Sequence, residues 1–102
     1  MSEISEIEAR IRKFAIERNW EDFHTPKNLA MAITGEAGEL AAEFQWLTPD
    51  ESCKLNEPKL EAVSLEIADI AIYLIRLADI TGINLIDCIN KKMTINEDRF
   101  PA

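Results

Sequence analysis

Glycine and proline are scarce in this sequence, with three glycines and four prolines among 102 residues. Because these residues interrupt helices and strands, their scarcity predicts long regular elements. Cysteine is also scarce: Cys53 and Cys88 lie far apart, match no metal-ligand spacing, and are expected to be reduced thiols. Apolar residues make up 47% of the chain, enough for a core, so we expect one folded domain over residues 1–102.

Basic residues are in the minority, 11 against 19 acidic residues, for a formal net charge of −8. Binding to a nucleic-acid polymer needs a basic surface and is not expected, whereas a nucleotide held through metal ions is compatible with this charge. The N-terminus lacks the basic and apolar segments of a signal peptide. The most apolar stretch, residues 63–80, carries four charged residues, too many for a membrane span. We therefore expect a cytoplasmic protein with no membrane partner.

The apolar residues recur at helical spacing throughout, without strand alternation, which predicts an all-α fold. Thr25-Pro26 is typical of a helix start, and Gly82 of the position just after a helix end. Residues 48–57 are expected to form a polar loop. The predicted helices cover residues 5–18 (with a start as early as Ser2), 26–46, 58–81 and 85–100.

The third predicted helix is apolar nearly all round, so most of its surface must be covered. Three other short helices would not cover it alone. We therefore expect the four-helix fold to be completed by a homo-oligomer.

Four acidic residues stand in apolar helical sequence as two matched pairs: Glu36 with Glu39, and Glu66 with Asp69. Their i, i+3 spacing places both carboxylates of a pair on one helix face. The loop between the second and third helices is short, which makes these helices antiparallel neighbours and brings the pairs together. Four carboxylates would repel strongly without a cation, and an oxygen-only site suits Mg²⁺. Spacing alone also fits solvated acids in so acidic a chain.

A di-iron site is the alternative use of carboxylates in a helical bundle, but such sites take Glu-x-x-His from two helices. The only histidine, His24, follows neither acidic pair at that spacing. Magnesium is therefore favoured, with Mn²⁺ as a substitute.

A basic face on the fourth predicted helix is a second candidate group. Lys92, Asn96 and Arg99 are spaced to share one side of this helix. Taken alone, a solvated helix end favourable to the helix dipole explains them best. Beside a metal cluster they become a candidate clamp for phosphate oxygens.

Aromatic residues form a third candidate group: Trp20, Trp46 and Tyr73, together with His24. Tyr73 shares a helix face with Glu66 and Asp69, where a base or sugar could stack. Taken alone, each aromatic residue is explained better by ordinary core packing.

Motifs of these residues follow one another along nearly the whole chain: Trp20-x-x-Phe23-His24, Gly35-Glu36-x-Gly38-Glu39-Leu40, Glu66-x-x-Asp69-x-x-x-Tyr73 and Lys92-Met93-x-x-Asn96-x-x-Arg99. In this order they resemble the MazG-like all-α nucleoside triphosphate pyrophosphohydrolases, closest to the dCTP pyrophosphatase branch. The resemblance implies Mg²⁺-dependent cleavage of a (deoxy)nucleoside triphosphate, dCTP or a modified dCTP, to monophosphate and pyrophosphate. It also implies a helical homodimer, often paired into a tetramer, with sites at subunit interfaces.

The same resemblance implies roles for individual residues. The four acidic residues would be the catalytic metal ligands. Glu43, one turn beyond Glu39, is a candidate for orienting water. The substrate-binding residues would be Trp20, His24, Asn28, Trp46, Tyr73, Lys92, Asn96 and Arg99.

Two departures from that branch stand out. Phe100 stands where a tyrosine is common, which removes a hydroxyl. The loop over residues 48–57 is short, which leaves the cover of the pocket and the base preference open. The alternatives are a pyrophosphohydrolase that prefers dUTP or another modified nucleotide, and a non-catalytic helical oligomer that binds nucleotides or a protein partner.

Overall fold

The computed structural model describes residues 2–102, which form five helices and no strand. The predicted all-α fold and its four long helices are confirmed, with ends that agree to within two residues. The structure adds a single helical turn inside the predicted loop, which a capping box between Thr48 and Glu51 stabilises. The helices are α1 (Glu3–Glu17), α2 (Pro26–Phe44), α3 (Pro49–Ser52), α4 (Glu57–Thr81) and α5 (Leu85–Arg99).

The ends of the helices follow from local chemistry. The Thr25 side chain accepts a hydrogen bond from the Asn28 N–H (3.2 Å) at the start of α2. Gly82 ends α4 in the left-handed region, at φ 73°. Asn19 takes the same conformation (φ 57°) after α1, and the Trp20 N–H then bonds the Ala15 carbonyl at 3.0 Å. Asparagine is among the few non-glycine residues that adopt this conformation readily.

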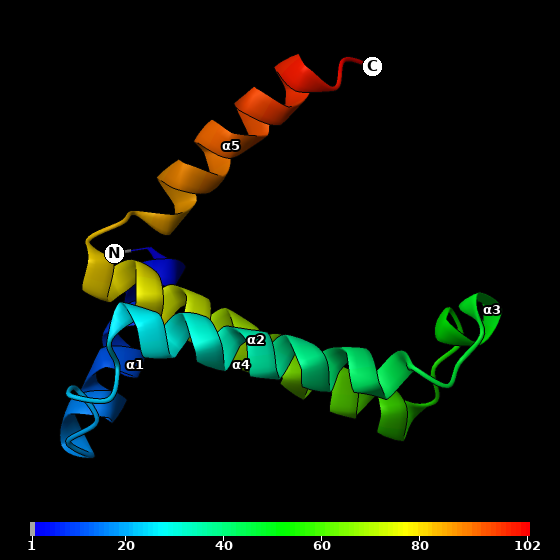
Figure 1. The fold of residues 1–102 in the computed structure, drawn as a ribbon, viewed down its shortest axis with the longest axis horizontal. Helices are drawn as coiled ribbons and strands as arrows, with labels where there is room; N and C mark the ends of the chain where they lie inside the picture. The colour runs from blue at the N-terminus through cyan, green and yellow to red at the C-terminus, as the bar shows by residue number, and fades with distance from the viewer. Residues whose placement is uncertain (1) are drawn as a thin grey trace.

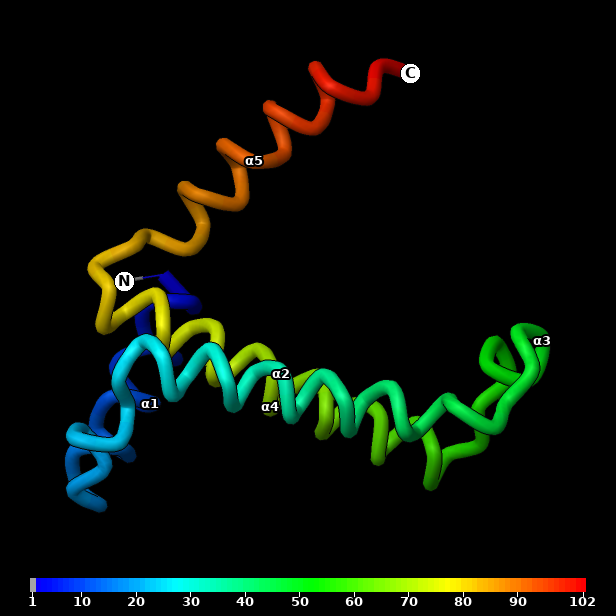
Figure 2. The backbone as a smooth tube through the Cα atoms, in the orientation of Figure 1, coloured from blue at the N-terminus to red at the C-terminus, as the bar shows by residue number. Residues whose placement is uncertain are grey.

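The centre of the molecule is the antiparallel pair of α2 and α4, which lie side by side along their length (Figures 1 and 2). Leu29 from α2 and Val63 from α4 are buried between the helices of this body. At one end α1 packs against α4, where Ala15, Ile75 and Ala78 are buried. The pair α2–α4 is the scaffold on which both predicted acidic motifs lie.

Helix α5 projects away from this body (Figure 1). Its apolar residues Ile86, Ile89 and Met93 are 44–51% exposed. The radius of gyration is 16.3 Å, against about 13 Å for a compact chain of this length. The accessible surface is 7932 Å², against about 5,800 Å² for a monomeric protein of this mass. One chain thus leaves an unusually large surface uncovered.

Helix α4 shows the same excess in detail. Leucine and isoleucine side chains point out from several of its turns: Leu60, Leu65, Ile67, Ile72 and Leu74 are all exposed. The expectation that this helix is not covered within one chain is therefore met. Among residues 2–102, no helix combines the length and apolarity needed to cross a membrane.

Candidate functional site

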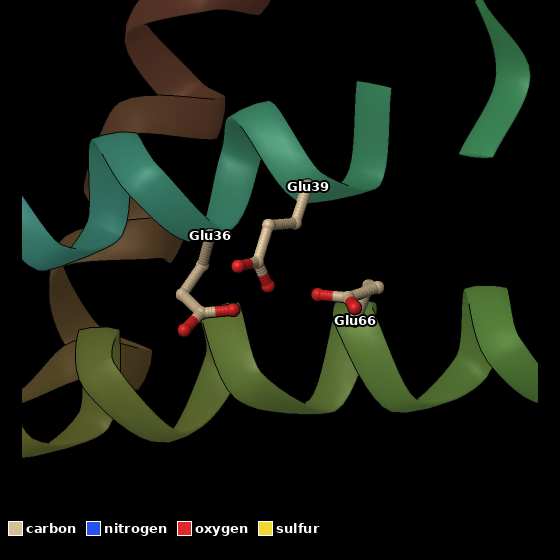
Figure 3. Close-up of side chains that lie close together, drawn as sticks. All are labelled: Glu36, Glu39 and Glu66. Atoms are coloured by element: carbon tan, nitrogen blue, oxygen red, sulfur yellow. The ribbon is translucent and has the colours of Figure 1, made fainter. Parts of the chain in front are cut away.

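Three of the four predicted carboxylates converge between α2 and α4. Glu36 and Glu39 point from α2 towards α4, and Glu66 points back from α4 (Figure 3). One carboxylate oxygen from each lies within 4.8 Å of the other two. The i, i+3 spacing on α2 and the antiparallel packing of α2 on α4 together produce this cluster.

Two oxygens of the cluster lack any partner. Glu36 Oε2 and Glu66 Oε2 are buried, and no donor among the described residues reaches either atom. Buried polar atoms nearly always have a hydrogen-bond partner, and a carboxylate oxygen can only accept. A cation between these oxygens would satisfy them, and the all-oxygen donor set suits Mg²⁺ or Mn²⁺.

The electrostatics of the cluster agree with this fit. Desolvation raises the pKa of Glu36 above its ordinary value, and the charges of Glu39 and Asp69 raise it further. The pKa of Glu66 is raised by desolvation first and then by Glu39. Like charges that are held this close disfavour ionisation, and a divalent cation reverses that effect.

Asp69 lies one turn of α4 beyond Glu66 and is exposed. Its charge contributes to the raised pKa of both Glu36 and Glu66. It nevertheless lies outside the group of three oxygens that are mutually within 4.8 Å. The predicted set of four is therefore arranged as three close carboxylates with the fourth beside them.

Two of the predicted substrate-binding residues lie near the connector between α1 and α2. The ring centroids of Trp20 and His24 are 6.0 Å apart, and the ring of Phe14 lies edge-on to that of Trp20 with 5.5 Å between their centroids. Asn28 uses its side-chain amide to donate to the Phe23 carbonyl (3.1 Å), which holds the connector against α2. This contact gives Asn28 a structural role that the sequence did not predict.

Trp46 lies beyond the opposite end of α2 and is 86% exposed. Helix α2 rises about 27 Å from Pro26 to Phe44. One chain therefore does not bring Trp46 to Trp20 and His24. Tyr73 is half-buried on α4, one turn beyond Asp69.

The predicted phosphate-binding residues also lie apart from the carboxylates. Lys92, Asn96 and Arg99 all belong to α5, which projects away from the α2–α4 pair (Figure 1). The structure of a single chain thus assembles the acidic part of the predicted site and separates it from the basic part.

Glu43 is engaged elsewhere. Its carboxylate accepts from Lys59 Nζ at 3.0 Å in an ion pair between α2 and α4. This ion pair uses Oε1 of Glu43 only, so the role of Glu43 in orienting water stays a prediction.

A polar network around the buried Arg76 was not predicted from the sequence. Arg76 is only 6% exposed, and its Nε–H donates to His24 Nδ1 at 3.2 Å. Its Nη1 lies 3.4 Å from Asp79, which in turn holds Arg12 of α1 through two hydrogen bonds of 2.8 and 2.9 Å. The signal was present: Arg76 and Asp79 are an i, i+3 pair of opposite charge in the most apolar stretch of the chain.

Comparison with known proteins gives consistent relatives. A sequence model of the MazG-like family matches residues 31–102, more than half of the chain. The chain is 44% identical over 92 residues to dCTP pyrophosphatase 1 from Homo sapiens, and 41% identical over 92 residues to the protein of that name from Mus musculus. Each match covers 88% of this chain and 54% of the relative. The chain therefore spans about half the length of these two relatives.

A solved structure shares the whole fold. The crystal structure of a pyrophosphatase from Archaeoglobus fulgidus superposes with a TM-score of 0.94 at 39% sequence identity. The match covers 100% of this chain and 95% of that chain, so the projecting α5 has a counterpart in a crystal structure.

Proposed function

This chain belongs to the MazG-like family, and we propose that it is a Mg²⁺-dependent nucleoside triphosphate pyrophosphohydrolase that acts on dCTP or a modified dCTP. The observation that carries the proposal is the cluster of Glu36, Glu39 and Glu66, with two buried oxygens that have no partner. The names of the relatives, dCTP pyrophosphatase 1 and pyrophosphatase, support the reaction and the substrate class.

The acidic residues define where the metal would be held. Glu36, Glu39 and Glu66 would bind Mg²⁺ directly, and Asp69 would join them by a change of side-chain rotamer. When bound, Mg²⁺ would offset the charge of the triphosphate and lower the pKa of a coordinated water.

A second copy of the chain would complete the site. Within one chain, Trp46 and α5 lie apart from the residues with which the family resemblance groups them. The chain also exposes about 2,100 Å² more surface than a monomer of its mass should. Two such excesses together are the size of an obligate homodimer interface. We infer a homodimer, or a pair of dimers, in which α5 of one copy lies over the α2–α4 pair of another.

In that assembly the chain's own residues would do three things. Trp20, His24 and Tyr73 would hold the nucleoside, with Trp46 from the other copy. Lys92, Asn96 and Arg99 would hold the β- and γ-phosphates and offset the charge on the leaving group. A water oxygen then attacks the α-phosphorus, the bond from this phosphorus to the α–β bridging oxygen breaks, and pyrophosphate leaves.

The test is a product analysis. The purified protein is incubated with each dNTP and Mg²⁺, and monophosphate, pyrophosphate and orthophosphate are quantified. We expect dCMP and pyrophosphate in equal amounts from dCTP. Release of orthophosphate in place of pyrophosphate would contradict cleavage between the α- and β-phosphates. Turnover of dUTP alone would contradict dCTP as the substrate. A folded sample that hydrolyses no nucleotide would refute the proposed activity and favour the alternative of a non-catalytic binding oligomer.

Substitutions test the metal assignment. We expect Glu39→Gln and Asp69→Asn each to abolish turnover, because each removes a charge that the cation needs, while the helical content stays unchanged. Glu61→Gln, an exposed position on the same helix as Asp69, is the control and should keep full activity. Activity retained in both site variants would refute the assignment.

A further inference from the structure

The partly buried network around Arg76 has a part in the function proposed above only through His24. It joins three segments of the chain: α1 through Arg12, α4 through Arg76 and Asp79, and the connector through His24. Arg76 is the only charged residue among those that are buried in the described part of the chain. Burial of a guanidinium costs free energy unless acceptors bind its N–H groups, so Arg76 needs the acceptors that His24 and Asp79 supply.

The contact between Arg76 and His24 determines where the imidazole carries its proton. A guanidinium has only donors, so His24 Nδ1 must accept the hydrogen bond from Arg76 Nε (3.2 Å). A neutral imidazole has one protonated nitrogen, and Nδ1 is excluded. The proton is therefore on Nε2, which leaves that nitrogen as a donor at the other edge of the ring.

We propose that Arg76 is a positioning residue that keeps His24 neutral with its proton on Nε2, so that His24 presents a hydrogen-bond donor to an acceptor atom of the bound nucleoside. This inference rests on the proposed function for its ligand, since His24 is placed in the nucleoside pocket there. The acceptor is of the class that a pyrimidine carbonyl or a sugar oxygen supplies.

The charges around His24 support the neutral form. Burial lowers the pKa of His24 below its ordinary value, and the positive charge of Arg76 lowers it further. Nη1 of Arg76 lies 3.4 Å from Asp79 on the same helix. Asp79 accepts a hydrogen bond from Arg12 of α1, which also donates to Glu8. Protonation of His24 would turn Nδ1 into a donor that faces the Arg76 donor, so it would break this contact.

Nuclear magnetic resonance can read the tautomer directly, because His24 is the only histidine of the chain. Long-range ¹H–¹⁵N correlation spectra of the imidazole would be recorded from pH 5 to 8 without ligand. We expect Nδ1 of the wild-type protein to be unprotonated at neutral pH and the ring to titrate below the ordinary value. In Arg76→Gln, whose amide can donate or accept, we expect both tautomers and a titration closer to the ordinary value. Arg10→Gln, an exposed arginine on α1, is the control and should match the wild type.

Kinetics then test the link to the nucleoside. We expect Arg76→Gln to raise KM by about two- to tenfold with kcat nearly unchanged. This rise in KM corresponds to the free energy of about one hydrogen bond. In a His24→Asn background the same substitution should add no further effect, because Arg76 acts through His24. Additive effects of the two substitutions would overturn the proposal.

The outcomes separate this inference from the proposed function. A wild-type spectrum with Nδ1 protonated overturns the inference even if Arg76→Gln fails to fold, because it needs no variant. Equal spectra for wild type and folded Arg76→Gln overturn it as well. A wild-type chain that hydrolyses no nucleotide while its His24 carries the proton on Nε2 refutes the proposed function and, with it, the nucleoside as ligand, and confirms the tautomer that Arg76 imposes.

Discussion

We expect the substitution Ile89→Asp in α5 to dissociate the protein into smaller species. Ile89 belongs to the apolar side of α5 with Ile86 and Met93, and this helix has little cover in a single chain. The excess surface of about 2,100 Å² per chain must be covered for the chain to resemble other proteins of its mass. Since α5 projects from the body, its apolar side is the part of that surface that a second copy can reach first.

The size of the effect follows from the exposure of this side chain. Ile89 is 47% exposed, so about half of the 1.5–3 kcal/mol for full burial of such a side chain remains to be gained in an interface. A two-fold dimer contains the contact twice, so its loss weakens association by about 10- to 150-fold. Burial of the new carboxylate adds to that loss.

The assay must measure mass. A compact dimer of two 102-residue chains has an expected radius of gyration of about 17 Å, close to the 16.3 Å of the single extended chain. The radius of gyration would not distinguish a dimer from a single chain. The molecular mass from light scattering would, because a single chain has a mass of 11.6 kDa and an oligomer has a multiple of it. Lys91→Asp, about 200° around α5 from Ile89, is the matched control and should leave the mass unchanged.

Two results would refute this reasoning. A wild-type mass of 11.6 kDa at micromolar concentration would show that the uncovered surface is stable in water. A full-size oligomer of the Ile89→Asp variant, with unchanged midpoint on dilution, would show that α5 takes no part in the assembly.

Two further predictions concern stability. The pKa values of Glu36 and Glu66 are raised in the folded state, so their contribution to stability is complete below the ordinary value of 4.5 and is lost as the pH rises through the folded-state values. Mg²⁺ should therefore raise the unfolding temperature more at pH 8 than at pH 5. An equal rise at both pH values, or an equal rise with NaCl of matched ionic strength, would contradict a metal site. Asp79→Asn should lower the free energy of unfolding by about 1–3 kcal/mol, because it leaves the buried Arg76 without its acidic partner. Since the pKa of Asp79 is lowered, that difference in stability is present above the ordinary value of 3.8 and shrinks as the pH falls through the folded-state value. Urea titrations of this variant and of an Asp98→Asn control would measure the difference and its pH dependence. An Asp79→Asn variant as stable as the control would contradict the role of the pair Arg76–Asp79.

The sequence predicted the long helices well because their signals are local. Thr25-Pro26 and Gly82 mark helix ends through their own backbone preferences, and the structure has helix ends there. The single turn of α3 was missed because four residues carry no periodicity. Its capping box, Thr48 with Glu51, has the Thr-x-x-Glu spacing that is typical of a helix start, so the sequence contained a signal for α3.

The acidic cluster was predictable for the same reason. Glu36 and Glu39 share a face by spacing, and a short connection makes α2 and α4 neighbours, so convergence with Glu66 needs no knowledge of the rest of the fold. The contact of Arg76 with His24 was not predictable, because 52 positions separate the two residues and nothing local specifies their meeting. The position of Asp69 beside the cluster depends on side-chain rotamers, which spacing does not determine.

The position of α5 shows why a family resemblance and a single-chain structure describe different things. The resemblance groups Lys92 and Asn96 with the carboxylates, while in the single chain they lie on a helix that projects away from them. Both descriptions hold if the two groups belong to different copies. The carboxylates, which repel one another, then lie within one chain, and the cationic side chains come from another. Assembly would thus bring cationic side chains to the carboxylates of a chain whose formal net charge is −8, so a triphosphate would find its phosphate-binding residues only where two copies meet.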